Sequence, residues 1–185
     1  MERTLTSVTG FEATHPQIAE SAWVHGSAVV IGNVTVGADS SIWPLAVLRG
    51  DVHWIRIGER TSIQDGSILH VTHDSEHAPG GSPLLVGNDV TVGHRVILHG
   101  CTVGNFCLIG MGAIVMDGAV IEDRTIIGAG SLVPGGRRLE GGHLYVGSPA
   151  RKVRPLTAEE MLYLEYSARH YVKLKERHRV AELSG

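Results

Sequence analysis

Residues 103–133 read VGNFCLIGMGAIVMDGAVIEDRTIIGAGSLV, and an aliphatic side chain occupies every sixth position of this stretch. The positions are Val103, Ile109, Val115, Ile121, Ile127 and Val133. A period of six differs from the helical period and from the two-residue alternation of one extended strand. It is typical of a parallel β-helix, in which short strands turn corners and stack coil upon coil.

The same spacing extends towards the N-terminus with two interruptions, a three-residue insertion that we place at Trp54–Arg56 and a loop before Val86. The earlier aliphatic positions are Ile18, Val24, Val30, Val36, Ile42, Leu48, Ile57, Ile63, Leu69, Val86, Val92 and Leu98. Because three units complete one coil, we expect coils to begin near residues 18, 36, 57, 86, 103 and 121, about 4.8 Å apart as strands stack in any sheet.

A second set of residues, four places after the first six aliphatic positions, is small or β-branched. Its members are Ala22, Ala28, Val34, Ser40, Ala46 and Val52. Small side chains fit where the walls of a narrow solenoid converge, so we expect this set to face the core as well.

Two segments depart from the repeat. Residues 73–84 are rich in proline and glycine, which predicts an external loop. Past Val133 the aliphatic pattern fades. We therefore assign residues 1–154 to a β-helix domain and residues 155–185 to a C-terminal helix.

The segment after Pro155 has high helix propensity. Thr157 and Glu160 are spaced as a capping box, in which each side chain bonds the backbone amide of the other residue. One apolar face follows at helical spacing: Met161, Leu164, Ala168, Tyr171 and Leu174. We expect this face to pack along the solenoid, because so much apolar surface would otherwise remain in water.

Composition and charge argue against several classes of partner. Lys plus Arg number 16 and Asp plus Glu number 19, so the net charge of -3 gives no electrostatic reason to bind nucleic acid or an anionic membrane. Residues 1–20 lack the features of a signal peptide and no membrane-length apolar run occurs, so a cytoplasmic location is expected. The two cysteines, Cys101 and Cys107, are interpreted as small core residues.

Three polar residues fall at one offset of the repeat. Arg49, His70 and His99 each follow a leucine that opens the third unit of its coil, so the three side chains are expected to stack in one column. His70 and His99 then lie one rung apart. At that separation two imidazoles can reach one zinc ion with bonds of about 2.0 to 2.1 Å.

His94 is the obvious third ligand, but it lies in the preceding unit, around a corner from His99. We expect it to face a different wall, so that a threefold assembly would bring His94 of one chain to the pair on another. Three imidazoles with a fourth position open to water form a catalytic zinc site, and such an ion lowers the pKa of its water to about 7. Fe²⁺ or Co²⁺ would suit the same ligands.

Four runs of sequence resemble the γ-carbonic anhydrase family, and the resemblance spans most of residues 12–175. The runs are SIWPLAVLRGD at residues 41–51, IQDGSILH at 63–70, VGHRVILHG at 92–100 and LYVGSPA at 144–150. The resemblance implies a left-handed β-helix of triangular cross-section and a homotrimer with zinc between subunits. It also implies that His70 and His99 share the ion with His94 of a neighbouring chain.

The resemblance assigns roles around that ion. Arg49 matches an arginine that forms an ion pair between subunits, and Asp51 and Asp65 match its acidic partners. A purely structural contact between subunits remains an equal alternative for Arg49. Gln64 matches the residue that hydrogen-bonds the metal-bound water or bicarbonate.

The sequence departs from the family archetype in its proton pathway. Val52 stands where the archaeal form has an active-site glutamate, and the acidic loop that carries the proton-shuttle glutamate is missing. His73 is a candidate shuttle, because imidazole titrates near neutral pH, and the favoured alternative is an ordinary residue exposed on the loop. Tyr145 resembles an active-site polar residue of some bacterial members. Such departures mark a bacterial subgroup whose members are labelled carbonic anhydrase-like, carnitine- or phenylacetate-associated, or hexapeptide transferase.

Three functions are therefore compatible with the sequence. The first is a zinc-dependent lyase that hydrates carbon dioxide reversibly to bicarbonate with metal-bound hydroxide. The second is transfer or hydrolysis of a coenzyme A thioester, as in other hexapeptide-repeat proteins. The third is a trimeric scaffold with a structural metal, because a fold by itself does not identify an activity.

Overall fold

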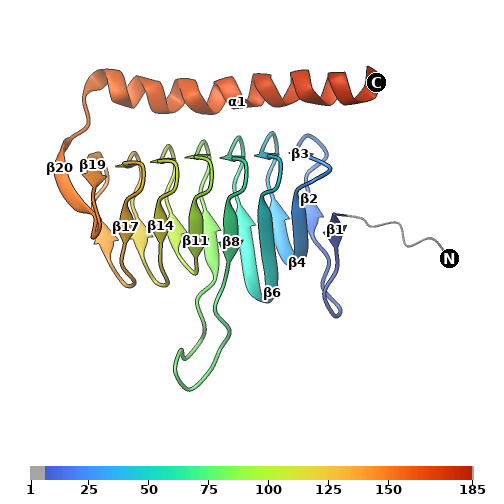
Figure 1. Cartoon of the computed structure of the whole chain (residues 1–185), viewed down its shortest axis with the longest axis horizontal. Coiled ribbons are helices and arrows are strands. Elements are labelled where there is room, and N and C mark those ends of the chain that lie inside the picture. Colours follow the sequence, from blue (N-terminus) through green and yellow to red (C-terminus); the bar gives the residue numbers. More distant parts are fainter. Residues whose placement is uncertain (1–6, 185) are drawn as a thin grey trace.

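Short parallel strands wind into a left-handed β-helix with one long helix beside it (Figure 1). This computed structural model describes residues 7–184, so the predicted domain limits at residues 1 and 185 lie outside the described residues. Three faces form the solenoid, and each coil contributes one strand to each face. The hexapeptide fold expected from the repeat is confirmed.

Each face is a stack of short strands. Face one contains β2 (Gln17–Ile18), β9 (Leu84–Val86), β12 (Thr102–Val103), β15 (Val120–Ile121) and β18 (Arg138–Leu139). Face two contains β3 (Trp23–Val24), β5 (Ser41–Ile42), β7 (Ser62–Ile63), β10 (Thr91–Val92), β13 (Leu108–Ile109), β16 (Ile126–Ile127), β19 (His143–Val146) and the antiparallel β20 (Arg151–Pro155). Face three contains β1 (Val8–Thr9), β8 (Ile68–His70), β11 (Ile97–His99), β14 (Ile114–Val115) and β17 (Leu132–Val133). Two longer strands, β4 (Val29–Val36) and β6 (Val47–Ile57), run around the corner from face three to face one.

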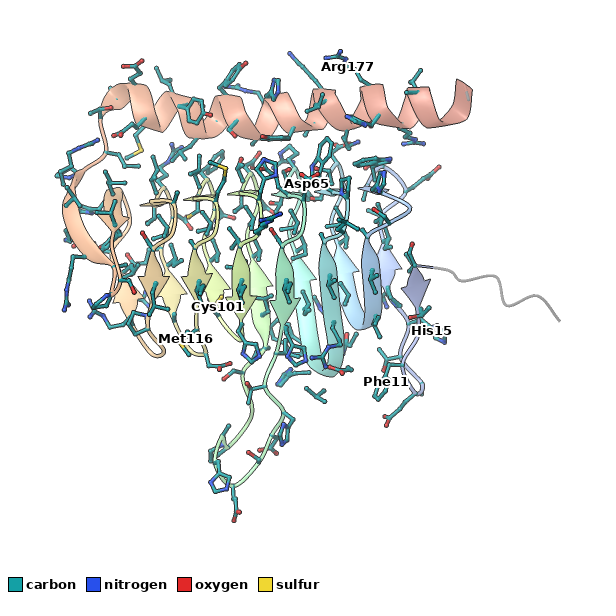
Figure 2. The ribbon with its side chains drawn as sticks, viewed as in Figure 1. Phe11, His15, Asp65, Cys101, Met116 and Arg177 are labelled. Atoms are coloured by element: carbon teal, nitrogen blue, oxygen red, sulfur yellow. The ribbon has the colours of Figure 1, made fainter. Side chains whose placement is uncertain are left out.

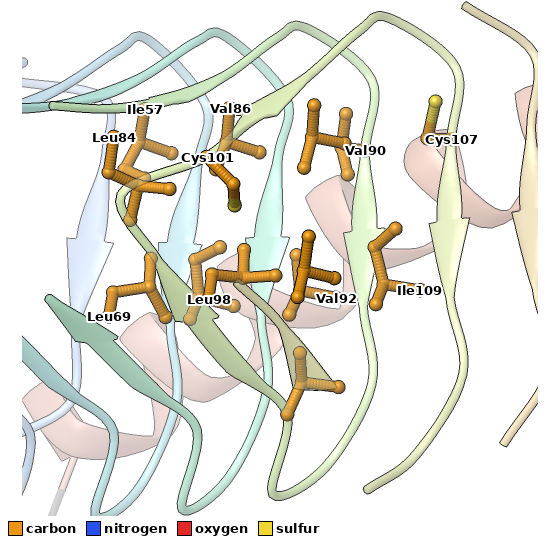
Figure 3. Close-up of a cluster of buried hydrophobic side chains, with 14 of the residues drawn as sticks. Ile57, Leu69, Leu84, Val86, Val90, Val92, Leu98, Cys101, Cys107 and Ile109 are labelled. Atoms are coloured by element: carbon orange, nitrogen blue, oxygen red, sulfur yellow. The ribbon is translucent and has the colours of Figure 1, made fainter. Parts of the chain in front are cut away.

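The predicted aliphatic columns form the core. On face one the residues that open successive coils pair in register: Ile18, Val36, Ile57, Val86, Val103 and Ile121. Figure 3 shows part of this cluster, in which aliphatic side chains of neighbouring coils fill the interior. Because strand pairing fixes the vertical register, residues at one offset of the repeat must stack above one another.

The predicted position of the insertion is wrong. In β6, Gly50 pairs with Gly32 and Ile55 pairs with Val34, so the additional residues lie between Gly50 and Ile55. Ile55 is fully buried, whereas Val52 is 44% exposed and does not face the core. The ladder resumes at Ile55, and the residues before it bulge outwards at the corner.

The solenoid continues beyond Val133, contrary to the expected fading of the pattern. Leu139 pairs with Ile121, and Tyr145 pairs with Ile127. Both side chains are buried, so the six-residue column simply passes to an aromatic residue in the last coil.

The segment between β8 and β9 leaves the solenoid and projects from it as a loop (Figure 1). Thr72 and Ser82 exchange two backbone hydrogen bonds of 3.0 and 2.9 Å at its base, and Ser75 bridges to Ala78 near its tip. The loop is therefore anchored immediately after His70.

The helix α1 (Ala158–Ser184) lies along face two (Figure 1). Its capping box is present: Thr157 Oγ1 accepts from the Glu160 amide, and Glu160 accepts from the Thr157 amide. Leu164 and Ala168 are buried against the solenoid, as predicted. Lys175 is fully buried too, and its ammonium donates to the Ser21 carbonyl oxygen at 2.8 Å. Within the described chain, no helix has the length and apolarity of a membrane span.

Candidate metal centre

His70 and His99 stack at the corner between faces three and one. They pair directly in β8 and β11, and Nδ1 of His70 lies 3.1 Å from Nε2 of His99. Two nitrogens bound to one tetrahedral zinc ion at ordinary bond lengths lie about 3.3 Å apart. The adjacency predicted from the repeat is therefore present, with a nitrogen separation that suits a shared ion.

A charged pair extends the His70 side of this corner. Asp51 Oδ1 lies 3.1 Å from Nε2 of His70, and Asp51 Oδ2 accepts from the Arg49 guanidinium at 2.5 Å. Burial would raise the pKa of Asp51, but hydrogen bonds from Arg49 and His70 lower it below its ordinary value. Burial lowers the pKa of His70, which favours the neutral imidazole that metals bind.

His99 has a carboxylate partner that the sequence analysis missed. Its Nδ1 lies 2.9 Å from Asp117 Oδ1. Asp117 belongs to the next coil, at the level of Gly100 rather than of His99. The sequence does contain a signal for this contact, because Gly100 stands at the same offset as Asp117 one coil earlier. A residue without a side chain leaves room for a neighbouring carboxylate.

His94 and Asp65 lie at the other edge of face three. Nδ1 of His94 is 2.9 Å from Asp65 Oδ2, and both side chains are about half exposed. Figure 2 shows Asp65 on the side of the solenoid that faces α1 and Met116 towards the opposite edge. Met116 marks the edge of His99, because the residues before them, Val115 and Leu98, pair in register. Among residues 7–184 no three His, Cys, Asp or Glu side chains gather closely enough to hold a metal within one chain.

Gln64 lies in the half of the site that contains His94. Gln64 is 4% exposed, and its side chain faces the Tyr171 hydroxyl of α1. Gln64 and His94 both line a groove of about 360 Å³ between α1 and face two. Leu108, Met111, Ile126 and Tyr163 contribute apolar surface to this groove.

The two remaining predicted residues lie apart from these groups. His73 is exposed on the loop, three residues after His70. Tyr145 is buried in the core of face two, three coils beyond Val92, and its hydroxyl donates to the Glu140 carbonyl oxygen at 3.1 Å. The stacking of the solenoid therefore brings Tyr145 to neither half of the site, and its assignment by motif lacks structural support.

Comparison with known proteins agrees with this architecture. The family model described as bacterial transferase hexapeptide (six repeats) matches residues 100–135. Protein YrdA of Escherichia coli K12 is 58% identical over 161 residues, which cover 87% of this chain and 88% of YrdA. Gamma carbonic anhydrase 3 of Arabidopsis thaliana mitochondria is 47% identical over 176 residues, covering 95% of this chain and 67% of that protein.

A solved structure extends the comparison. The hexapeptide transferase family protein from Anaplasma phagocytophilum superposes with a TM-score of 0.83 at 41% sequence identity, covering 91% of this chain and 96% of that one. Relatives of this similarity carry both carbonic anhydrase and transferase names, so they establish the family of this chain but not its activity. The chain belongs to the γ-carbonic anhydrase-like family of hexapeptide-repeat proteins.

Proposed function

We propose that this protein is a zinc-dependent carbonic anhydrase that hydrates carbon dioxide reversibly at sites shared between subunits. The observation that carries the proposal is the 3.1 Å separation between imidazole nitrogens of His70 and His99. The third imidazole, His94, is held through Nδ1 by Asp65, so its Nε2 remains available to an ion. A relative named gamma carbonic anhydrase supports the same reaction.

The outer surfaces of the solenoid support a homotrimer. Face two is covered by α1, and the outward positions of face one include Gln17, Thr35, Arg56, Thr102 and Arg138. Face three instead presents one outward column of aliphatic residues: Val29, Val47, Ile68, Ile97, Ile114 and Leu132. This column separates the two halves of the site. A threefold assembly around face three would bury it and bring each His94 edge to the His70 and His99 edge of the next chain.

The donor set fits zinc. Three imidazoles are a ligand set of catalytic zinc sites, and each imidazole has its own aspartate: Asp51 for His70, Asp65 for His94 and Asp117 for His99. Carboxylates in this position orient an imidazole and make it a better donor. Fe²⁺ and Co²⁺ also bind imidazole, so the metal itself is a proposal.

When bound, the ion supplies hydroxide at neutral pH as the nucleophile for carbon dioxide. The chain's own residues then position the reactants and move the proton. Gln64 is the amide in the His94 half and would hydrogen-bond an oxygen of bicarbonate. Arg49, held by Asp51 in the first half, would reach Asp65 of the adjoining chain and fix the register of the two halves. His73 is exposed and would pass the released proton to buffer.

A second candidate is hydrolysis or transfer of a coenzyme A thioester. The groove between α1 and face two favours it, because about 360 Å³ of partly apolar space beside His94 is larger than carbon dioxide requires. The hexapeptide transferase name of the Anaplasma phagocytophilum structure points the same way.

Stopped-flow carbon dioxide hydration by zinc-loaded protein tests the proposal, with a His94→Ala variant as the comparison. The wild-type protein should accelerate hydration and the variant should be inactive. Equal inactivity of the two proteins would refute the carbonic anhydrase proposal. Metal-dependent cleavage of acetyl-coenzyme A would then favour the second candidate, and full zinc occupancy without either reaction would favour a scaffold.

A further inference from the structure

Asp117 connects His99 to the base of the projecting loop. Its Oδ1 lies 2.9 Å from Nδ1 of His99 and accepts a 3.0 Å hydrogen bond from Thr72 Oγ1. Thr72 is itself fixed by its two backbone hydrogen bonds to Ser82. One carboxylate oxygen of Asp117 therefore contacts both the Thr72 hydroxyl on the loop and a ring nitrogen of His99.

Gly100 makes room for this contact. A β-carbon on Gly100 would overlap Asp117 Oδ1 and would stand 2.6 Å from the β-carbon of Ser82. The Gly118 amide also donates to the Gly100 carbonyl oxygen at 2.7 Å, which holds the two corners together. The position of Asp117 is thus determined from both sides, by the backbone of its own corner and by the loop.

A carboxylate that accepts from Nδ1–H selects one tautomer of an imidazole and leaves the Nε2 lone pair free. In His99 this free atom is the nitrogen that lies 3.1 Å from Nδ1 of His70. We propose that Asp117 is the positioning residue of His99 and orients its Nε2 towards the shared ion, and that the hydrogen bond from Thr72 couples this orientation to the anchored loop. The inference rests on the proposed metal function, in which His99 is a ligand.

The first test needs no metal. Nitrogen NMR of metal-free protein, with the His99 signals identified by their loss in His99→Gln, should give the Nδ1–H tautomer in the wild type. Asp117→Ala should lose that preference, and the nearly isosteric Asp117→Asn should weaken it. An Nε2–H tautomer in the wild type, or no change in Asp117→Ala, would overturn the assignment.

The second test measures zinc affinity by competition with a chelator. Asp117→Ala should bind zinc about 10- to 100-fold more weakly, as outer partners of metal-bound histidines generally do. Thr72→Val should give a smaller loss. Asp74→Asn is the matched control, because its carboxylate accepts from the Gly80 amide within the same loop without touching Asp117, and its zinc affinity should equal that of the wild type.

Unfolding midpoints of the metal-free proteins distinguish a positioning role of Asp117 from a general destabilisation of the fold. Asp117→Asn should weaken zinc binding while it unfolds at the wild-type denaturant concentration. Wild-type zinc affinity in both Asp117 variants would overturn the proposal. If the wild-type protein binds no zinc, the proposed function fails, and the tautomer of His99 alone then decides whether Asp117 positions it.

Discussion

Ile97 of β11 pairs in register with Ile68 of β8, and both side chains point away from the core, with 36% and 46% of their surface exposed. Two residues further along each strand stand His99 and His70. The apolar column and the histidine column therefore share the same strands, so an assembly that buries the apolar column also positions the histidines.

Replacing Ile97 with glutamate should dissociate the proposed trimer, because three like charges would face one another inside an apolar interface. Light scattering coupled to gel filtration should give the mass of one chain for Ile97→Glu and of three chains for the wild type. Leu85→Glu is the control, since Leu85 is 40% exposed on face one, and that variant should remain trimeric. A trimeric Ile97→Glu would contradict the proposed interface.

Replacing Gly100 with alanine should weaken zinc binding. The new β-carbon would overlap Asp117 Oδ1 and force the carboxylate away from His99. Gly112→Ala is matched for backbone strain, because Gly112 has φ +69° and Gly100 has φ +52°, but nothing lies within 4 Å of a β-carbon at Gly112. Chelator competition should give a loss of about tenfold or more in Gly100→Ala only. Equal affinities in the two variants would contradict the steric explanation.

Replacing the buried Lys175 with alanine should destabilise the docking of α1. The ammonium is fully buried, donates to the Ser21 carbonyl oxygen and lies 3.5 Å from Asp39 Oδ1. Removing it leaves the part-buried Ser21 carbonyl oxygen without this donor, which costs about 1–3 kcal/mol of unfolding free energy. Urea unfolding measures the loss. Lys173→Ala, at an exposed position two residues earlier, should change the unfolding free energy by less than about 0.5 kcal/mol.

The two cysteines should make stability fall at high pH. Burial raises the pKa of the Cys101 thiol and raises that of Cys107 to about 12. An unfolded thiol ionises near pH 8.5, so above that pH the unfolded state has lost protons that the folded state keeps. The free energy of unfolding should therefore decrease as the pH rises from about 9 towards 12.

Urea midpoints at pH 8 and pH 10 measure this decrease. A Cys101→Ala, Cys107→Ala double variant should show a smaller difference between the two midpoints, because only the thiol contribution is removed. Ellman's reagent should also leave both thiols of the native protein unmodified at pH 8 and modify both in urea. Rapid modification of the native protein would show that the thiols are not protected by burial.

The stacked half of the site could be predicted because a six-residue period leaves no freedom of register. Once Leu69 and Leu98 share a column, His70 and His99 must be neighbours. The insertion in β6 could not be placed in the same way, because Val52 and Ile55 are both aliphatic and β-branched. Only the pairing of Ile55 with Val34 distinguishes the inward residue from the outward one.

The repeat pattern does not predict contacts between side chains at the corners of the solenoid. Asp117 reaches His99 because the Gly100 corner lacks a side chain and Thr72 approaches from a loop outside the repeat. Burial of Lys175 was also not predicted, since a lysine on a helix is ordinarily solvated. Its acceptor, the Ser21 carbonyl oxygen, lies 154 positions away in the sequence.

Complementation between two inactive variants tests the shared metal site most directly. Chains with His94→Ala retain His70 and His99, and chains with His70→Ala retain His94. In trimers formed by mixing the two chains equally, about a quarter of the interfaces would unite intact halves, because each half is present with a probability of one in two. We predict zinc binding and carbon dioxide hydration near that fraction of the wild-type level. Mixed trimers, verified by native mass spectrometry, that bind no more zinc than either variant alone would contradict a site shared between subunits.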